Sequence, residues 1–513
     1  MEWYLLGNQV INPFSETSQE MALQFDKATI EGNAEKILDL ISKAEKLLQT
    51  GNAASQATLY YSIATAYSDY YALCNISGDE PIRKQLYAFR KSISLIESEQ
   101  CNKEEYAPYV KEFKFRLYTN YANTLDRCGR TIAAIAQYKK VLALNPDFGM
   151  ALGNLGRTYM KYGNLEYDPG HRDYFHYHAY SLLDQATVSR DDATHDDARA
   201  YFESVLYLYD VEYIDHLFDV LPNISDMEYE NVDELAYREW ALSNGLFLNT
   251  LNDLPEPKLR FAADVIQLPN MIVAVNAKPV FHGMFNQIKQ EYIYARYMYY
   301  SSLQVPDKPH FADTETYLLN SFDYPQYSIR IEQLKSAYKT LYGLFDKVAF
   351  FINAYFDLGI HERDVSFSSI WLNEHGPKKQ RYKNKNNLAP ESNFALSSLY
   401  WISRDFTEKF EDSPNPQLQR LKDLRHAMEH RYIKVVWSLF SGCATDAYDD
   451  LAVYVSEDEL YDSTLELMRI VREVIVCLAL SVNIEESDRK SKMDKSKKIM
   501  PMTIMGYDDQ WKL

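Results

Sequence analysis

The segment 118-YTNYANTLDRCGRTIAAIAQYKKVLALNPDFG-149 indicates how the first part of the chain folds. Large apolar side chains recur at helical spacing on both sides of Gly129, which predicts two helices joined by a tight turn. Pro146 ends the second helix, because proline cannot continue one. Starting 34 residues after Tyr118, the segment 152-LGNLGRTYMKYG-163 repeats this spacing. The repetition predicts a stack of helical hairpins.

The repeat is weaker on either side of these two segments. Upstream, the pattern of residues 36–73 predicts another helical hairpin. Downstream, we interpret 164–178 as an insertion that displaces the second helix of its unit. The units resemble the tetratricopeptide repeat (TPR). This resemblance implies a solenoid that binds peptides or proteins and performs no chemistry itself.

The remainder of the chain also has helical periodicity. Amphipathic helices are predicted over 233–254 and 285–303. Four longer helices, typical of a helical bundle, are predicted near 327–360, 392–410, 417–438 and 456–483. At the start of the last one, Ser456 and Glu459 have the spacing of a capping box.

The expected fold is therefore all-α, and the 17 Gly and 18 Pro, few for this length, argue against an all-β fold. We expect a TPR-like α-solenoid over 1–190, a helical extension over 191–310, and a helical bundle over 311–490. A basic segment and tail are expected over 491–513.

Composition excludes several classes of protein. The five scattered cysteines lack C-x-x-C spacing, which argues against a disulfide framework or a zinc ribbon. The N-terminus lacks the pattern of a secretion signal, and the most apolar run, 474–482, has nine residues. Since a bilayer-spanning helix needs about 20, we expect a cytoplasmic protein without a membrane partner.

The net charge of −19 by itself disfavours nucleic-acid binding, which needs Lys and Arg. Positive charge is nevertheless concentrated in 378–385 and 489–498, with five and six basic residues. These runs are either solvated loops or contacts for RNA. The candidate RNA-binding residues are Lys378, Lys379, Arg381, Lys383, Lys385, Lys492 and Lys495.

A polar cluster occupies 424-LRHAMEHRY-432, in the third predicted bundle helix. Helical spacing places Asp423, His426 and His430 on one face. It places Arg425, Glu429 and Tyr432 on the adjacent one. The apolar stripe of this helix is predicted to contain Leu418, Leu421, Leu424, Met428 and Val435.

Three interpretations of this cluster compete. It is a solvated helix face with an Arg425–Glu429 ion pair, a metal site, or a site of metal-free RNA cleavage. A metal site would use His426 and His430, with Asp423, but no further ligand is evident, so no metal or cofactor is expected.

Other polar and aromatic clusters are interpreted as packing. The histidines of 171-HRDYFHYH-178 (His171, His176 and His178) do not share a helix face. The tyrosines of 285–303 are also interpreted as packing rather than as a platform for bases. Asp346 and Lys347 either line a cleft or form a buried ion pair.

The spacing of Arg425 and His430 resembles the R-x4-H motif of the HEPN superfamily (higher eukaryotes and prokaryotes nucleotide-binding). His426 fits the polar residue that follows Arg in this family. Tyr432 extends the likeness to the R-x4-H-x-Y form of HEPN toxins controlled by nucleotidyltransferase antitoxins. Phe367 and Trp371, spaced F-x-x-x-W, are part of the same resemblance.

This resemblance implies a homodimeric, metal-independent endoribonuclease that leaves 2′,3′-cyclic phosphate and 5′-OH ends. It implies that His430 is a general acid or base, Arg425 a phosphate clamp, and His426 a polar partner or second acid–base group. Asp423, Glu429 and Tyr432 are possible supporting residues. The TPR-like region would bind a protein partner, antitoxin or trigger of a toxin or antiphage effector. The alternative is an inactive scaffold that binds RNA, nucleotide or protein.

Overall fold

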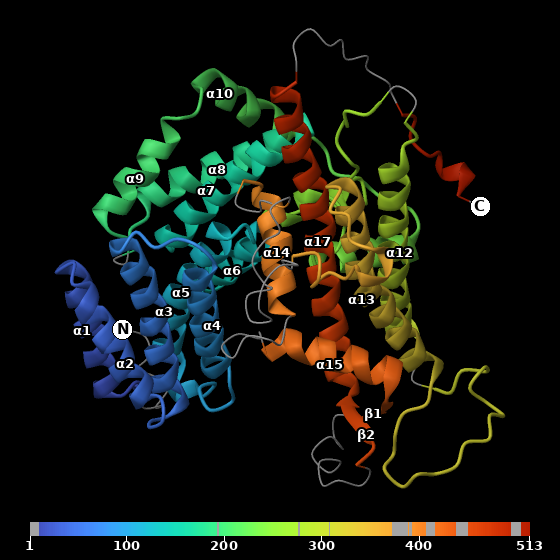
Figure 1. Cartoon of the computed structure of the whole chain (residues 1–513), viewed down its shortest axis with the longest axis horizontal. Coiled ribbons are helices and arrows are strands. Elements are labelled where there is room, and N and C mark those ends of the chain that lie inside the picture. Colours follow the sequence, from blue (N-terminus) through green and yellow to red (C-terminus); the bar gives the residue numbers. More distant parts are fainter. Residues whose placement is uncertain are drawn as a thin grey trace.

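The computed structural model describes residues 10–191, 194–274, 277–306, 308–371, 388, 392–406, 416–437, 450–493 and 504–512. Helices dominate these ranges, and the sheet found there has two short strands (Figure 1). The prediction of an all-α fold is therefore confirmed.

The N-terminal part is an array of packed helical pairs, in which α3 lies on α4, α5 on α6, and α7 on α8 (Figure 1). Its helices are α1 (Glu16–Ile30), α2 (Ala34–Leu47), α3 (Ala53–Leu73), α4 (Asp79–Ile96), α5 (Ala107–Arg127), α6 (Thr131–Leu144), α7 (Gly149–Leu165) and α8 (Pro169–Val188). The hairpin predicted over 36–73 is formed by α2 and α3, and the one over 118–149 by the end of α5 with α6. Whether these hairpins are TPR units stays a prediction.

The segment 164–178 displaces the second helix of its unit, as predicted, although most of the segment is part of that helix. It is helical from Pro169 onwards, and α8 begins four residues later than a strict 34-residue repeat of α6 would place it. Asp168 caps this helix by accepting a hydrogen bond from the His171 N–H, and Pro169 occupies the first turn. The second helix of the unit is therefore displaced by about one turn.

Gly129 makes the turn between α5 and α6, and a side chain at this position is expected to destabilise the protein. Its φ is +92°, and a Cβ at this position would collide with the Phe394 carbonyl of the C-terminal region. Replacing Gly129 with alanine should lower the free energy of unfolding by more than the roughly 1–2 kcal/mol of left-handed backbone strain alone. Urea unfolding measures this effect.

Gly32 provides the control for this substitution. Its φ is +63°, but a Cβ there would meet nothing within 4 Å. Gly32→Ala should therefore lose only the backbone contribution. Equal losses in the two variants would show that the contact with Phe394 does not matter for stability.

Shorter helices connect the array to the C-terminal region. They are α9 (Asp196–Leu206), α10 (Val211–Val220), α11 (Val232–Ser243) and the 3-10 turn η4 (Thr250–Asp253). The helix predicted over 233–254 ends eleven residues early, at Ser243. The cause is Gly245, whose φ of +68° turns the chain out of the helix.

The C-terminal region is a helical bundle. Its helices are α12 (Val280–Gln304), α13 (Ile329–Tyr355), α14 (Phe394–Asp405), α15 (Pro416–His430) and α17 (Glu457–Ser491). Both α12 and α17 pack against α13 (Figure 1). The Ser456 hydroxyl caps α17 by accepting from the Glu459 N–H at 3.1 Å, as its sequence position predicts.

The third bundle helix is shorter than predicted. It ends at His430, and residues predicted to continue it form strand β1 (Tyr432–Val436). This strand pairs in parallel with β2 (Ala452–Ser456), which leads directly into α17. Because β-branched and aromatic residues together form the majority of both strands, these segments suit a pleated surface better than a helix. Tyr432 and Val435 therefore lie outside the helix that carries the motif.

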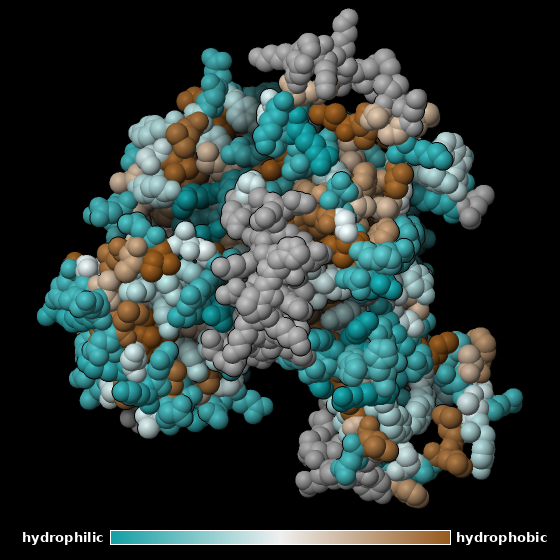
Figure 2. Space-filling view, viewed as in Figure 1, coloured by the Kyte–Doolittle hydropathy of each residue, from teal (hydrophilic) through white to brown (hydrophobic). Residues whose placement is uncertain are grey.

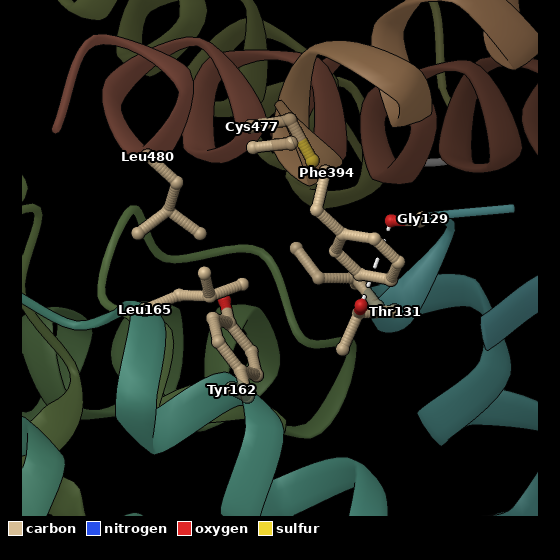
Figure 3. Close-up of a pocket in the computed structure, with 9 residues that line it drawn as sticks. Gly129, Thr131, Tyr162, Leu165, Phe394, Cys477 and Leu480 are labelled. Atoms are coloured by element: carbon tan, nitrogen blue, oxygen red, sulfur yellow. Dashed lines mark hydrogen bonds between the residues drawn. The ribbon is translucent and has the colours of Figure 1, made fainter. Parts of the chain in front are cut away.

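The helical array and the bundle share one continuous apolar core. At their junction is a small pocket, lined by Tyr162 and Leu165 of α7 and by Phe394 and Leu480 of the bundle (Figure 3). Nearby, the Ser397 hydroxyl donates to the Cys128 carbonyl at 2.9 Å.

A buried charge cluster joins the same two regions. Arg90 of α4 makes a bidentate ion pair with Asp405, at 2.6 and 2.7 Å. Arg130, just before α6, lies 3.0 Å from Asp405 and 2.8 Å from Glu473 of α17. All four side chains are at most 8% exposed. The bundle is thus held to the array by paired charges as well as by apolar packing.

The segment 308–327 projects from the bundle next to the sheet (Figure 1). Its base is fixed because the buried Asp323 carboxylate pairs with Lys434 of β1 and the Gln326 N–H donates to the Val435 carbonyl. Beyond the base, Phe311, Tyr317, Leu319 and other large apolar side chains are exposed. Figure 2 shows apolar patches on this projection.

No helix among the described residues is both long enough and apolar enough to cross a membrane.

Candidate functional site

The inner side of α15 fixes the helix in the bundle. Leu418, Leu421 and Leu424 are buried, as the predicted stripe requires, and Met428 is partly buried. The Tyr338 hydroxyl of α13 donates a hydrogen bond to the Leu421 carbonyl. This contact and the apolar packing set the rotation of α15, which determines the side chains that face solvent.

The outer side of α15 presents Asp423, His426 and His430, all exposed, on one face as predicted. The centroids of the two imidazole rings lie 5.3 Å apart in an edge-to-face arrangement. Asp423 accepts a hydrogen bond from Gln419 at 3.1 Å. Two imidazoles are thus available to a ligand that approaches this face.

Glu429 connects the two ends of the motif. One of its carboxylate oxygens, Oε2, lies 2.9 Å from Arg425 Nε and 3.6 Å from His430 Nε2. The predicted Arg425–Glu429 ion pair is therefore formed. The Arg425 Nε–H lacks hydrogen-bonding geometry towards any described partner, so the contact is electrostatic.

Helix α13 forms a second wall beside Arg425. The guanidinium carbon lies 5.1 Å from the centroid of the Tyr342 ring. One turn further on, Asp346 is at the rim of the site. Desolvation raises the pKa of the Asp346 carboxyl, and the positive charge of Arg425 opposes that rise.

Asp346 and Lys347 do not form the buried ion pair that was one of the two alternatives. Lys347 instead pairs with Glu291 of α12. The Asp346 carboxylate accepts a hydrogen bond from the Phe367 N–H at 3.3 Å and interacts with Arg425 and Glu429. The position of Asp346 agrees with the other alternative, in which this residue lines the site.

One comparison with known proteins identifies the part of the chain that carries this site. Residues 272–485 match the model of a family described as LA2681-like HEPN. This part of the chain is a HEPN-type domain. Comparison with curated proteins and with solved structures gave no significant match. Helices α12 to α15, both strands and most of α17 lie within the matched range.

The range of the HEPN-type domain begins earlier than the predicted bundle boundary at 311, because it includes α12. In the structure α12 packs along α13. Phe367 and Trp371 of this domain are both buried, and the Trp371 indole N–H donates to the Phe367 carbonyl at 2.8 Å. This pair therefore stabilises the chain beside Asp346.

Tyr432 does not share a helix face with Arg425, which corrects the prediction. It lies on β1, is 44% exposed, and has Lys434 Nζ 5.0 Å from its ring centroid. The structure therefore gives Tyr432 no contact with the Arg425–Glu429 pair among the described residues.

The candidate RNA-binding lysines and arginine are not gathered at the motif within the described residues. Lys378, Lys379, Arg381, Lys383, Lys385 and Lys495 lie outside those residues. Lys492 is at the C-terminal end of α17 and pairs with Asp488 at 2.6 Å. A helix of 35 residues is about 50 Å long, and the sheet beside α15 adjoins the opposite end. Lys492 is thus far from the motif.

The other clusters considered from sequence are packing residues or lie at the surface. His176 packs edge-to-face on Tyr209, and His171 Nδ1 is 2.9 Å from the Thr250 hydroxyl. On α12, Tyr292 and Tyr299 are buried, whereas other tyrosines of this helix are half exposed. Among the described residues, no group of three or more His, Cys, Asp or Glu side chains is arranged to hold a metal ion.

Tyr342 is not among the site residues predicted from the sequence. Its position on an amphipathic helix gives no sign of a role, since aromatic residues are common on such helices. Only the packing of α15 on α13 brings the ring to Arg425.

Proposed function

We propose that this protein is a metal-independent endoribonuclease whose active site is built on α15. The observation that supports this proposal best is the arrangement of Arg425 and His430 around one Glu429 oxygen, within a HEPN-type domain. Without a metal, a guanidinium can stabilise negative charge on a phosphate and an imidazole can transfer a proton. RNA supplies its own nucleophile, the 2′-OH.

The proposed reaction is a transesterification. A base removes the proton of the 2′-OH while O2′ forms a bond to phosphorus. The P–O5′ bond breaks, and an acid gives a proton to the leaving O5′. His430 acts as one of these proton-transfer groups, and Arg425 binds the non-bridging oxygens as negative charge develops on them. The products carry 2′,3′-cyclic phosphate and 5′-OH ends.

A second acid–base group comes either from His426 or from a second copy of the chain. A two-fold contact across the exposed face of α15 would place two motifs at one phosphate. The apolar side chains of 308–327 offer additional surface for such a contact. A fully active monomer, as measured by light scattering, would contradict this dimer.

We further propose that the helical array senses a partner or is restrained by one, and thereby controls the nuclease, as in a toxin or an antiphage effector. The buried ion pairs between Arg90, Arg130, Asp405 and Glu473 give the array a direct mechanical connection to the bundle. Expression in bacteria should arrest growth, and Arg425→Ala should relieve the arrest. Arrest that persists in this variant would contradict a toxic nuclease.

The direct test is cleavage of total RNA and of a tRNA pool by the purified protein in excess EDTA. We expect cleavage products with cyclic phosphate ends and no products from Arg425→Ala, because the phosphate then lacks its clamp. Products with 3′-OH ends, or equal cleavage by the variant, would contradict the mechanism. RNA binding without cleavage by the wild type would favour a scaffold instead.

A further inference from the structure

The guanidinium of Arg425 is held from two sides, and only one of them belongs to its own helix. Glu429 lies one turn further along α15, with Oε2 2.9 Å from Arg425 Nε. On the opposite helix, α13, the Tyr342 ring centroid is 5.1 Å from the guanidinium carbon. This distance is within the range of a cation–π interaction.

The Tyr342 ring is itself fixed by aromatic neighbours. It makes edge-to-face contacts with Phe345 of α13 and with Phe406, which follows α14, at centroid distances of 5.6 and 6.0 Å. Two parts of the bundle, α13 and the end of α14, therefore determine where the ring lies. Asp346, one turn after Tyr342 on α13, attracts the same guanidinium.

We propose that Tyr342 is a positioning residue, which holds the Arg425 guanidinium in the orientation that receives a phosphate. This inference rests on the proposed ribonuclease function. Arginine has many rotamers, and each that is populated without substrate must be given up on binding. With Glu429 beside Nε and a ring against the guanidinium, the side chain is oriented before substrate arrives. Its terminal nitrogens then remain for the phosphate oxygens.

The test measures RNA affinity separately from cleavage. The probe is a fluorescein-labelled, 2′-O-methylated RNA 12-mer of mixed sequence, which cannot be cleaved because the nucleophile is blocked. Its affinity for the full chain is measured by fluorescence anisotropy at fixed salt. Loss of the ring in Tyr342→Leu should weaken binding about three- to tenfold, the range of a cation–π contact. Tyr342→Phe keeps the ring and should restore most of the affinity.

A double-mutant cycle separates positioning from general structural damage. If Tyr342 acts through Arg425, Tyr342→Leu should have little further effect in an Arg425→Ala background. Equal losses in both backgrounds would show that the ring has only a structural role, and would overturn the inference. Circular dichroism and thermal unfolding of each variant check that the bundle is intact.

The outcomes also distinguish this inference from the proposed function. If the wild type binds the 12-mer through Arg425 but Tyr342→Leu binds equally well, only the positioning role fails. If the wild type neither binds the 12-mer nor cleaves RNA, the proposed function fails and the inference fails with it. Expected support is a loss of affinity in Tyr342→Leu that depends on Arg425 and is rescued in Tyr342→Phe.

Discussion

Replacing His430 with alanine is expected to lower kcat/KM for RNA cleavage by about 10²- to 10⁴-fold, the usual contribution of one acid–base group. The imidazole is 58% exposed and packs little of the bundle, so the fold should be unaffected. Arg425 remains in this variant and still binds phosphate. The loss should therefore fall on kcat more than on KM. Cleavage of a defined RNA under single-turnover conditions in EDTA measures it.

His426→Ala is the matched control for His430→Ala. The two imidazoles are neighbours on one exposed face, but only His430 approaches the Glu429 oxygen that also contacts Arg425. The His426 variant should therefore lose less activity. If the two losses are equal, both imidazoles transfer protons. If His430→Ala cleaves as fast as the wild type, the catalytic group lies elsewhere.

The parts of the fold that depend on local sequence were predictable. Helical periodicity located α13 and α17, and Ser456 marked the start of α17 correctly. The leucines of α15 defined its buried side, and hence the exposed face with Asp423, His426 and His430. These features follow from side-chain spacing and capping, which act over a few residues.

The parts that depend on distant residues were not predictable. The end of α15 at His430 depends on pairing of β1 with β2, which begins twenty residues further along the chain. Periodicity within 417–438 contains no information about that partner. In the same way, the helical spacing of Arg425 and Glu429 predicts their ion pair, but it does not predict the contact of Arg425 with Tyr342. Contacts between helices decide which residues complete the site.

The same reasoning applies to the buried charges, whose partners are separated by 275 to 343 residues. Asp405→Ala is expected to lower the free energy of unfolding by about 3–5 kcal/mol, because it leaves buried cations without their carboxylate. Arg90 loses a bidentate partner, whereas Arg130 keeps Glu473. Urea unfolding monitored by circular dichroism measures the loss.

Asp39→Ala is the control, since Asp39 makes an exposed ion pair with Lys43 on α2 and should contribute little. The cost at Asp405 should also depend on Arg90, and replacing both residues with apolar ones of similar size should recover much of the stability. A loss at Asp405 no larger than that at Asp39 would show that water reaches the cluster.

Asp405 is the last residue of α14, and the next helix in the chain is α15, which carries the motif. If the array supports the site, loss of Asp405 should therefore also reduce RNA cleavage. Unchanged cleavage in a destabilised Asp405→Ala protein would show that the ion pairs hold the two regions together without influencing the motif.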